Sequence, residues 1–324
     1  MVVIGFHASH EQVHPAVLLD AVQAAEQAGF TAAMCSDHFA PWGERQGHSG
    51  FAWAWLGAAL QTTRLPFGVV TAPGQRYHPA VIAQAIGTLA AMYPGRFWAA
   101  LGSGEAVNEH VTGEGWPRKE VREARLGECV DVMRRLFAGE EVTHDGLVTV
   151  DRARLWTRPP VAPPLLGAAI SAETVRWVAQ WADGLITVHA PPRHLATMIE
   201  IYREAGGRGP VAVQVHLSFA RDADAALQIA HDQWRTNVFP GPLCWDIDTP
   251  RGFDQAAAHV PQEAVGDTVL VSDDPKRHVG WLQECASLDV DEIYLHHVGQ
   301  EQREFIDTFG AKVLPELDVT ARSS

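Results

Sequence analysis

The chain has 324 residues, of which 47% are hydrophobic and 20% are charged, as is typical of a globular protein and not of a disordered one. Its formal net charge of −14 excludes functions that need a basic surface, such as binding nucleic acid or an anionic membrane. No secretory signal pattern and no apolar run of the ~20 residues that span a bilayer is found. Because the four cysteines are scattered without paired spacing, we expect reduced thiols in a cytoplasmic protein.

Short apolar segments rich in β-forming residues alternate with segments whose apolar residues have helical spacing. Each strand candidate is followed by a helix candidate, which is typical of parallel strands joined by right-handed crossovers. The expected strands are 2–8, 32–37, 65–72, 97–104, 164–170, 184–190, 211–220 and 291–299.

Eight such units favour a closed (β/α)8 TIM barrel over an open doubly wound sheet. The first turn, "GFHASHEQ", also lacks the GxGxxG motif of a dinucleotide-binding sheet. The sequence therefore predicts an α/β protein with one domain, residues 1–318, and a C-terminal tail, residues 319–324. Residues 139–164 and the segment after Phe239 interrupt the alternation, and we expect both insertions to fold over the C-terminal face of the barrel.

Polar side chains gather where the expected strands end. Asp37 and His38 follow the second strand, and Glu105 and Asn108 follow the fourth. Active sites of TIM barrels lie at this end of the strands. An isolated histidine is most often structural, but the adjacent Asp37 and the following Trp42 distinguish His38 as a candidate catalytic residue.

Other histidines occur at strand ends, and they raise the question of a metal site. His7 and His10 after the first strand do not have the HxH spacing of a barrel metal site. Of the adjacent His296 and His297, only one can face the interior of a strand-lined barrel. The sequence therefore predicts no metal site.

Three motifs together resemble the luciferase-like flavin-dependent oxidoreductase superfamily. They are "CSDHFAPW" (35–42), "GSGEAVNE" (102–109) and "DEIYLHHVG" (291–299). The most similar branch contains glucose-6-phosphate dehydrogenase dependent on the deazaflavin coenzyme F-420 (F420). The resemblance covers nearly the whole chain and is densest in the first 140 residues.

The resemblance implies a flavin or deazaflavin across the C-terminal face and hydride transfer to or from a small organic substrate. In the matching motifs, His38, Trp42 and Glu105 surround the reacting carbon of the substrate. The Trp-rich connection that contains Trp42 is expected to form a wall over the flavin, whereas Trp53 and Trp55 have the spacing of a helix packed on the core.

The resemblance also implies a set of cofactor-binding residues. Asp37 contacts the ring or the ribityl hydroxyls, Asn108 and the backbone of the third strand line the ring, and the phosphate lies at the helix after the fifth strand. Family members often have a cis peptide after strand three, here expected at Val69–Val70 or Val70–Thr71. The positions that match are Asp37, Val70, Thr71, Asn108, Ala169, Ile170 and Ser171.

The chain departs from the sugar-phosphate enzyme in two late segments, 241–250 and 265–274. Neither contains Lys or Arg, and the first such residues after them are Arg251 and Lys276. We therefore expect a neutral, largely apolar substrate. The regions expected near the cofactor phosphate hold only Arg176 and Arg193, few cations for the polyglutamate tail of F420. The sequence therefore predicts flavin mononucleotide (FMN) as the cofactor, with F420 as the alternative.

Three alternatives stay open. The first is a flavin-dependent monooxygenase that uses O2, and the second is a deazaflavin-dependent dehydrogenase. The third is a flavin-binding storage protein without activity. A metal-dependent hydrolase is disfavoured by the missing ligand pattern. In each case we expect a small-molecule ligand and a homodimer.

Overall fold

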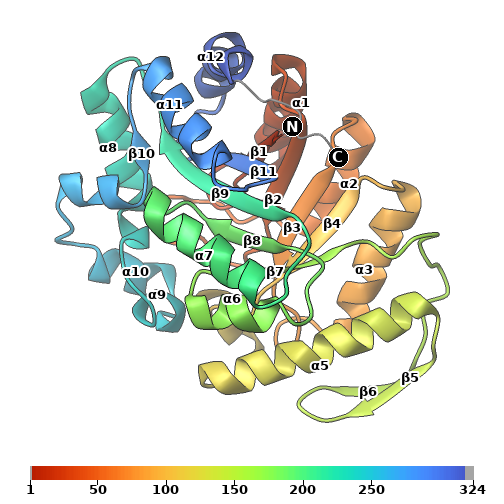
Figure 1. Cartoon of the computed structure of the whole chain (residues 1–324). Coiled ribbons are helices and arrows are strands. Elements are labelled where there is room, and N and C mark those ends of the chain that lie inside the picture. The colour runs from red at the N-terminus through yellow and green to blue at the C-terminus, as the bar shows by residue number, and fades with distance from the viewer. Residues whose placement is uncertain (1, 318–324) are drawn as a thin grey trace.

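The computed structural model describes residues 2–317, and its centre is a closed barrel of eight parallel strands (Figure 1). Each strand pairs with the next around the ring, and the β8–β9 and β9–β11 pairings close it. The predicted (β/α)8 barrel is confirmed. Its strands are β1 (Val3–Ala8), β2 (Ala32–Ser36), β3 (Phe67–Thr71), β4 (Phe97–Leu101), β7 (Leu165–Ala168), β8 (Leu185–Val188), β9 (Val211–Ser218) and β11 (Glu292–His297).

Helices surround the barrel. The sequence sets both ends of the first helix. Pro15 is its first residue, and the His14 side chain accepts a hydrogen bond from a backbone N–H of its first turn. Gly29 ends the helix in the left-handed region, with a φ of 104°. Its apolar face is buried against the strands. The ring consists of α1 (Pro15–Ala28), α2 (Ala52–Thr62), α3 (Pro79–Met92), α5 (Lys119–Ala138), α6 (Ala172–Val178), α7 (Pro192–Glu204), α8 (Ala223–Trp234), α11 (Pro275–Ala286) and α12 (Arg303–Lys312).

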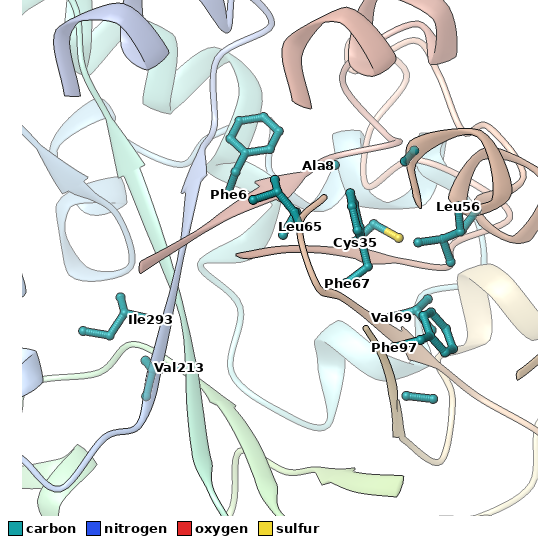
Figure 2. Close-up of a cluster of buried hydrophobic side chains, with 14 of the residues drawn as sticks. Phe6, Ala8, Cys35, Leu56, Leu65, Phe67, Val69, Phe97, Val213 and Ile293 are labelled. Atoms are coloured by element: carbon teal, nitrogen blue, oxygen red, sulfur yellow. The ribbon is translucent and has the colours of Figure 1, made fainter. Parts of the chain in front are cut away.

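Most of the apolar core lies between the strands and these helices. Figure 2 shows part of it, where side chains from β1, β2, β3 and β4 such as Phe6, Cys35, Phe67 and Phe97 meet residues of the neighbouring segments. These side chains are almost completely buried. Burial of apolar surface on this scale is the main driving force of the fold.

The interior of the barrel is filled by two large rings. A Cβ on Gly5 would lie 2.3 Å from the Tyr294 ring, and a Cβ on Gly68 would lie 2.0 Å from the Trp98 ring. Only glycine therefore leaves room for these rings, which contact each other edge to face at 5.9 Å. The plugged interior leaves the C-terminal end as the place for a cavity.

The second predicted insertion covers the C-terminal face. Residues 235–269, called here the lid segment, contain η2 (Arg235–Asn237), α9 (Leu243–Asp246), α10 (Pro250–Ala256) and η3 (Gln262–Asp267). The lid segment is followed by the short strand β10 (Leu270–Val271), which pairs with β9. Several lid side chains line the cavity described below, as the sequence analysis expected.

The first insertion lies elsewhere, so its predicted position is wrong. It forms a hairpin of β5 (Val142–Asp145) and β6 (Thr149–Ala153) that packs outside α3 and α5. The His144 ring lies 2.9 Å from Oε2 of Glu128 on α5, and the His78 ring lies 2.8 Å from the carbonyl oxygen of Thr149. These side-chain contacts hold the hairpin against the helices and away from the cavity.

The backbone corrects a second expectation. Within residues 2–317 the one cis peptide bond is Gly241–Pro242 in the lid segment. The prediction of a cis peptide bond at Val69–Val70 or Val70–Thr71 is therefore wrong. No helix in this part of the chain has both the length and the apolar character to cross a membrane. The predicted tail, 319–324, lies outside the described residues.

Candidate active site

A cavity of about 540 Å³ opens at the C-terminal end of the barrel, a size typical of small-molecule sites. Every residue that the sequence analysis chose as catalytic or cofactor-binding lines it. The structure thus brings together His38, Trp42, Glu105, Asp37, Val70, Thr71, Asn108, Ala169, Ile170 and Ser171.

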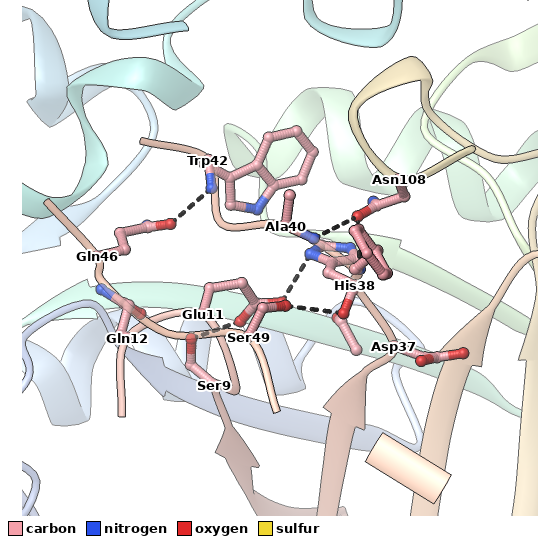
Figure 3. A network of polar contacts seen from close by, with 12 residues as sticks. Ser9, Glu11, Gln12, Asp37, His38, Ala40, Trp42, Gln46, Ser49 and Asn108 are labelled. Atoms are coloured by element: carbon pink, nitrogen blue, oxygen red, sulfur yellow. Dashed lines mark hydrogen bonds and ion pairs between the residues drawn. The ribbon is translucent and has the colours of Figure 1, made fainter. Parts of the chain in front are cut away.

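His38 lies between two carboxylates. Its Nδ1 is 2.6 Å from Oε1 of Glu11 (Figure 3). Its Nε2 is 3.7 Å from Oε2 of Glu105. Burial alone would lower the pKa of His38, but the two carboxylates, Glu11 above all, outweigh it and raise that pKa. Glu11 therefore fixes the ring from one side, and Nε2 is directed toward Glu105 across the cavity.

Glu11 itself is almost fully buried just after β1. Burial opposes its negative charge, yet the His38 ring and the Ser9 hydroxyl, which donates to Oε2 at 2.7 Å, lower the pKa of Glu11 to about 2. Sequence reasoning missed this residue. Its position at the end of the first strand, the same criterion that identified Asp37 and His38, was the available signal.

Glu105 precedes the short helix α4 (Ala106–Glu109) at the end of β4. Its side chain is 26% exposed, and burial is the main reason that its pKa is raised. Asn108 Nδ2 donates to its Oε2 at 3.2 Å. Glu105 therefore keeps a proton more readily than an ordinary glutamate, which suits proton exchange in the cavity.

Asn108 also holds the loop that carries His38. Its Oδ1 accepts from the backbone N–H of Phe39 at 2.8 Å and of Ala40 at 3.3 Å. The Ser49 hydroxyl donates to the carbonyl oxygen of His38 at 2.8 Å (Figure 3). One amide side chain thus positions both candidate proton carriers.

The Asp37 carboxylate is engaged by protein groups. It accepts hydrogen bonds from Trp53 Nε1 at 3.0 Å, Thr71 Oγ1 at 2.9 Å and the Tyr77 hydroxyl at 3.1 Å. Arg76 Nη2 lies 3.6 Å from Oδ2. Asp37 therefore anchors the wall formed by β2 and β3. The same contact explains Trp53, which is buried at the base of this wall, as the helical spacing predicted.

Trp42 forms the wall between the catalytic loop and the lid segment. Its ring contacts the His38 ring edge to face at 5.1 Å and the Phe253 ring of α10 at 5.3 Å. Gln46 Oε1 accepts from its backbone N–H at 2.8 Å. The predicted aromatic wall at Trp42 is thus present and tied to the lid.

Uncharged imidazoles form the floor of the cavity. His7 stacks on His296 at 4.3 Å, and Gln214 Nε2 lies near His216 Nε2 at 3.1 Å and His296 Nδ1 at 3.2 Å. Burial lowers the pKa of His7 to about 4 and of His216 to about 3, and it lowers that of His296 well below its ordinary value. The floor is therefore polar but neutral at physiological pH.

The adjacent histidines of β11 face opposite ways, as predicted. His296 lines the cavity, whereas His297 stacks on Phe305 of α12 at 5.2 Å. Within the described residues, no group of three or more His, Cys, Asp or Glu side chains is arranged to hold a metal ion.

Three cations line the cavity, and sequence reasoning missed all of them. They are Arg76, Lys119 and Arg122, whereas Arg176 and Arg193, which the sequence analysis placed near the phosphate, do not line it. The estimate of local charge from the sequence is therefore wrong. Two of these cations, Lys119 and Arg122, lie near the start of α5, and Arg76 lies in the connection between β3 and α3.

The opposite wall suits a flat ring. It is formed by small residues at the ends of β4 and β7, including Gly102, Gly104 and Ala168. Gly104 has a φ of 84°, and a Cβ there would lie 3.0 Å from Glu109 Cγ, so glycine is needed. Ser171 accepts from the backbone N–H of Thr174 at the start of α6. A wall of small side chains and backbone fits a tricyclic cofactor.

Comparison with known proteins identifies relatives of the whole chain. The profile of the family described as luciferase-like monooxygenase matches residues 1–292. An F420-dependent glucose-6-phosphate dehydrogenase of Intrasporangium calvum is 35% identical over 332 residues, which covers 98% of this chain and 99% of the relative. The protein of the same name from Nakamurella multipartita is 34% identical over 325 residues, with 97% and 96% covered.

Solved structures show the same fold. An F420-dependent secondary alcohol dehydrogenase in complex with an F420–acetone adduct superposes with a TM-score of 0.90 and 32% identity, covering 98% of this chain and 99% of that one. The F420-dependent tetrahydromethanopterin reductase of Methanopyrus kandleri has a TM-score of 0.78 at 20% identity, covering 98% and 99%. The second similarity concerns the fold alone.

Proposed function

Because the chain belongs to the luciferase-like monooxygenase family and is an oxidoreductase, we propose that it uses coenzyme F420 to interconvert a small neutral secondary alcohol and its ketone. The relatives over 30% identical named above are F420-dependent dehydrogenases. They favour the deazaflavin alternative over FMN, which was the first choice from the sequence, and over O2-dependent monooxygenation.

One observation carries the proposal: His38 lies in a cavity between the Glu11 carboxylate, which fixes it, and Glu105, whose pKa is raised by burial. F420, when bound, supplies the acceptor or donor of a hydride. Oxidation of an alcohol also requires removal of its hydroxyl proton. His38 accepts that proton at Nε2, and the Glu11 carboxylate stabilises the resulting imidazolium. Glu105, on the other side of Nε2, is a second group that can take up or release a proton in the cavity.

The cofactor-binding residues are part of the proposal. The ring would be held by Val70, Thr71 and the small residues at the ends of β4 and β7, together with Asn108 and Asp37, all of which line the cavity. The phosphate lies by Ala169, Ile170 and Ser171. These positions line one continuous cavity, which supports the assignment.

The substrate class follows from the lid segment. Its cavity-lining residues are Asn237, Phe239, Cys244, Trp245, Asp267 and Thr268, and none is a cation. A sugar phosphate dianion would therefore meet Asp267 and aromatic rings instead of Lys or Arg. The alcohol dehydrogenase with a TM-score of 0.90 is the better guide to the substrate.

A titration with a substrate panel tests the proposal. The purified protein is titrated with F420 and with FMN, and each complex is offered propan-2-ol, longer secondary alcohols and glucose 6-phosphate. We expect tighter binding of F420 and bleaching of its visible absorbance by secondary alcohols. Binding of FMN alone, or turnover of glucose 6-phosphate without alcohol turnover, would refute the proposed cofactor or substrate respectively.

We further propose that residues 1–318 act as one domain and that the protein is a cytoplasmic homodimer. The described cysteines are unpaired, which fits a reducing compartment. Exposed apolar side chains lie in or beside α1, α2 and α3, namely Val17, Phe39, Phe51 and Val81. Exposed apolar side chains favour self-association where they adjoin, and light scattering after size exclusion would measure the oligomeric state.

A further inference from the structure

Arg122 is a buried cation in the cavity wall that forms no direct ion pair. It is 7% exposed and lines the cavity. Arg76 lies near Asp37 and Glu109, and Lys119 lies 2.8 Å from Glu173 and 3.5 Å from Glu123. Among residues 2–317, no carboxylate lies within 4.0 Å of the Arg122 guanidinium. Burial of a charge without a close partner is costly. Burial lowers the pKa of Arg122, and the more distant carboxylates of Asp246, Glu123 and Glu120 offset this only in part.

The guanidinium is held in place by contacts that leave donors unused. Nη1 donates to the carbonyl oxygen of Pro117 at 2.6 Å, and the group lies over the Trp116 ring at 4.1 Å from its centroid. Nε is buried and has no hydrogen-bond partner among the described residues. Trp116 in turn donates to Oδ1 of Asp246 in α9 at 2.9 Å. Arg122 is thus a preorganised donor between α5 and the lid segment.

Its neighbours place Arg122 at the α6 side of the cavity. Lys119, one helical turn earlier on α5, bridges to Glu173 of α6, and Thr174 donates to Glu123 at 3.1 Å. Ser171, the proposed phosphate neighbour, caps the same helix. The acidic residues here are already engaged: Glu123 and Glu173 by Lys119, and Asp246 by Trp116.

We propose that Arg122 binds the anionic part of the cofactor beyond the ribityl chain, either the phosphodiester or a carboxylate of the polyglutamate tail. This inference rests on the proposed function, because it takes F420 as the ligand. An oxyanion would supply a close ion-pair partner and accept hydrogen bonds from guanidinium N–H groups that the protein leaves unused. The subsite would also discriminate F420 from shorter flavins.

Binding of three deazaflavins separates the two sources of the anion. Fluorescence titration at low salt uses full-length F420, F420 without glutamates, and the phosphate-free ribityl deazaflavin. For Arg122→Gln we expect about ten- to a hundredfold weaker binding of full-length F420 and unchanged binding of the phosphate-free form, the size of a lost charge-assisted hydrogen bond. Arg122→Lys, which keeps the charge, restores part of the affinity. Arg135→Gln on the same helix but outside the cavity is the matched control and leaves all three affinities unchanged.

Each outcome of these titrations supports or overturns the inference about Arg122. If Arg122→Gln weakens the binding of the glutamate-free form as well as that of full-length F420, Arg122 binds the phosphodiester. If it weakens the binding of full-length F420 alone, Arg122 binds the tail. Equal weakening of the phosphate-free form, or unchanged F420 affinity with a raised KM for substrate, overturns the inference. In the wild type, the affinity for F420 should fall as salt is added, whereas the affinity for the phosphate-free form should stay constant. If the ratio of the two affinities does not change with salt, the inference is also overturned. If the wild type binds none of the three, the proposed function itself fails.

Discussion

Oε1 of Glu11 lies 2.6 Å from Nδ1 of His38, in a pair contributed by the ends of β1 and β2. The pair orients the ring, raises the pKa of His38 and leaves Nε2 for the substrate. Although burial opposes its charge, the His38 ring and the Ser9 hydroxyl lower the pKa of Glu11 to about 2, so it remains a carboxylate throughout the physiological range. The reactivity of His38 is therefore set by Glu11.

Glu11→Gln should shift the pH profile of alcohol oxidation. Without the carboxylate the pKa of His38 falls, so the base is deprotonated at lower pH and the acidic limb of kcat/KM moves to lower pH. The plateau rate should fall about ten- to a hundredfold because the imidazolium loses its stabilising charge. Steady-state profiles of both enzymes measure this. An acidic limb that stays in place would show that Glu11 does not control His38.

Loss of the proton carriers should affect turnover and not cofactor affinity. His38→Ala and Glu105→Gln should each lower kcat by about 10²–10⁴-fold, with the Kd of F420 nearly unchanged. His194→Ala, at an exposed position on α7 outside the cavity, is the control and should leave both turnover and cofactor affinity unchanged. If both variants retain wild-type turnover but lose the cofactor, these residues bind the cofactor and do not transfer protons.

Asp37→Asn should destabilise the fold. The carboxylate accepts from three donors and faces the guanidinium of Arg76, so its loss leaves a buried cation with less compensation and costs about 3 kcal/mol. Asp131→Asn on α5, whose carboxylate is exposed and 3.7 Å from Arg135, should cost less than about 1 kcal/mol. Urea unfolding compares the two, and equal midpoints would contradict the anchoring role of Asp37.

Buried neutral histidines should make stability fall in mild acid. The pKa of His297 is lowered to about 4 by burial, so the unfolded chain takes up a proton before the folded one. Stability is therefore full above about pH 6.5 and is lost as the pH falls toward 4. Between about pH 7 and 5, wild type should lose about 2 kcal/mol more than His297→Gln.

Thermal or urea unfolding at the two pH values measures this difference. His194→Gln, at an exposed position on α7, is the matched control and should behave as wild type. Identical losses in wild type and His297→Gln would show that His297 does not titrate differently in the two states.

The sequence predicted the barrel and the catalytic loop because both follow from local pattern and topology. Alternating strands and helices specify a parallel sheet, and the ends of its strands converge, so His38 and Glu105 meet although they are far apart in the chain. Glu11 obeys the same rule. It was missed because it lies three residues beyond the end of β1, outside the motifs that carry the resemblance.

The remaining features depend on tertiary contacts that no periodicity reveals. The β5–β6 hairpin is held outside the helices by His144 and Glu128. Arg122 lies near the start of α5 and lines the cavity, although it is far in the chain from the strand ends that mark the site. The charge near the cofactor was therefore underestimated, and that error favoured FMN in the sequence analysis.

The most direct test of the central claim is rapid mixing of the F420-loaded protein with propan-2-ol and with propan-2-ol deuterated at the carbinol carbon. The account predicts bleaching of oxidised F420, slower with the deuterated alcohol, and at least about 10²-fold slower in His38→Ala. Absence of bleaching by any secondary alcohol, in a protein that binds F420 tightly, would contradict it.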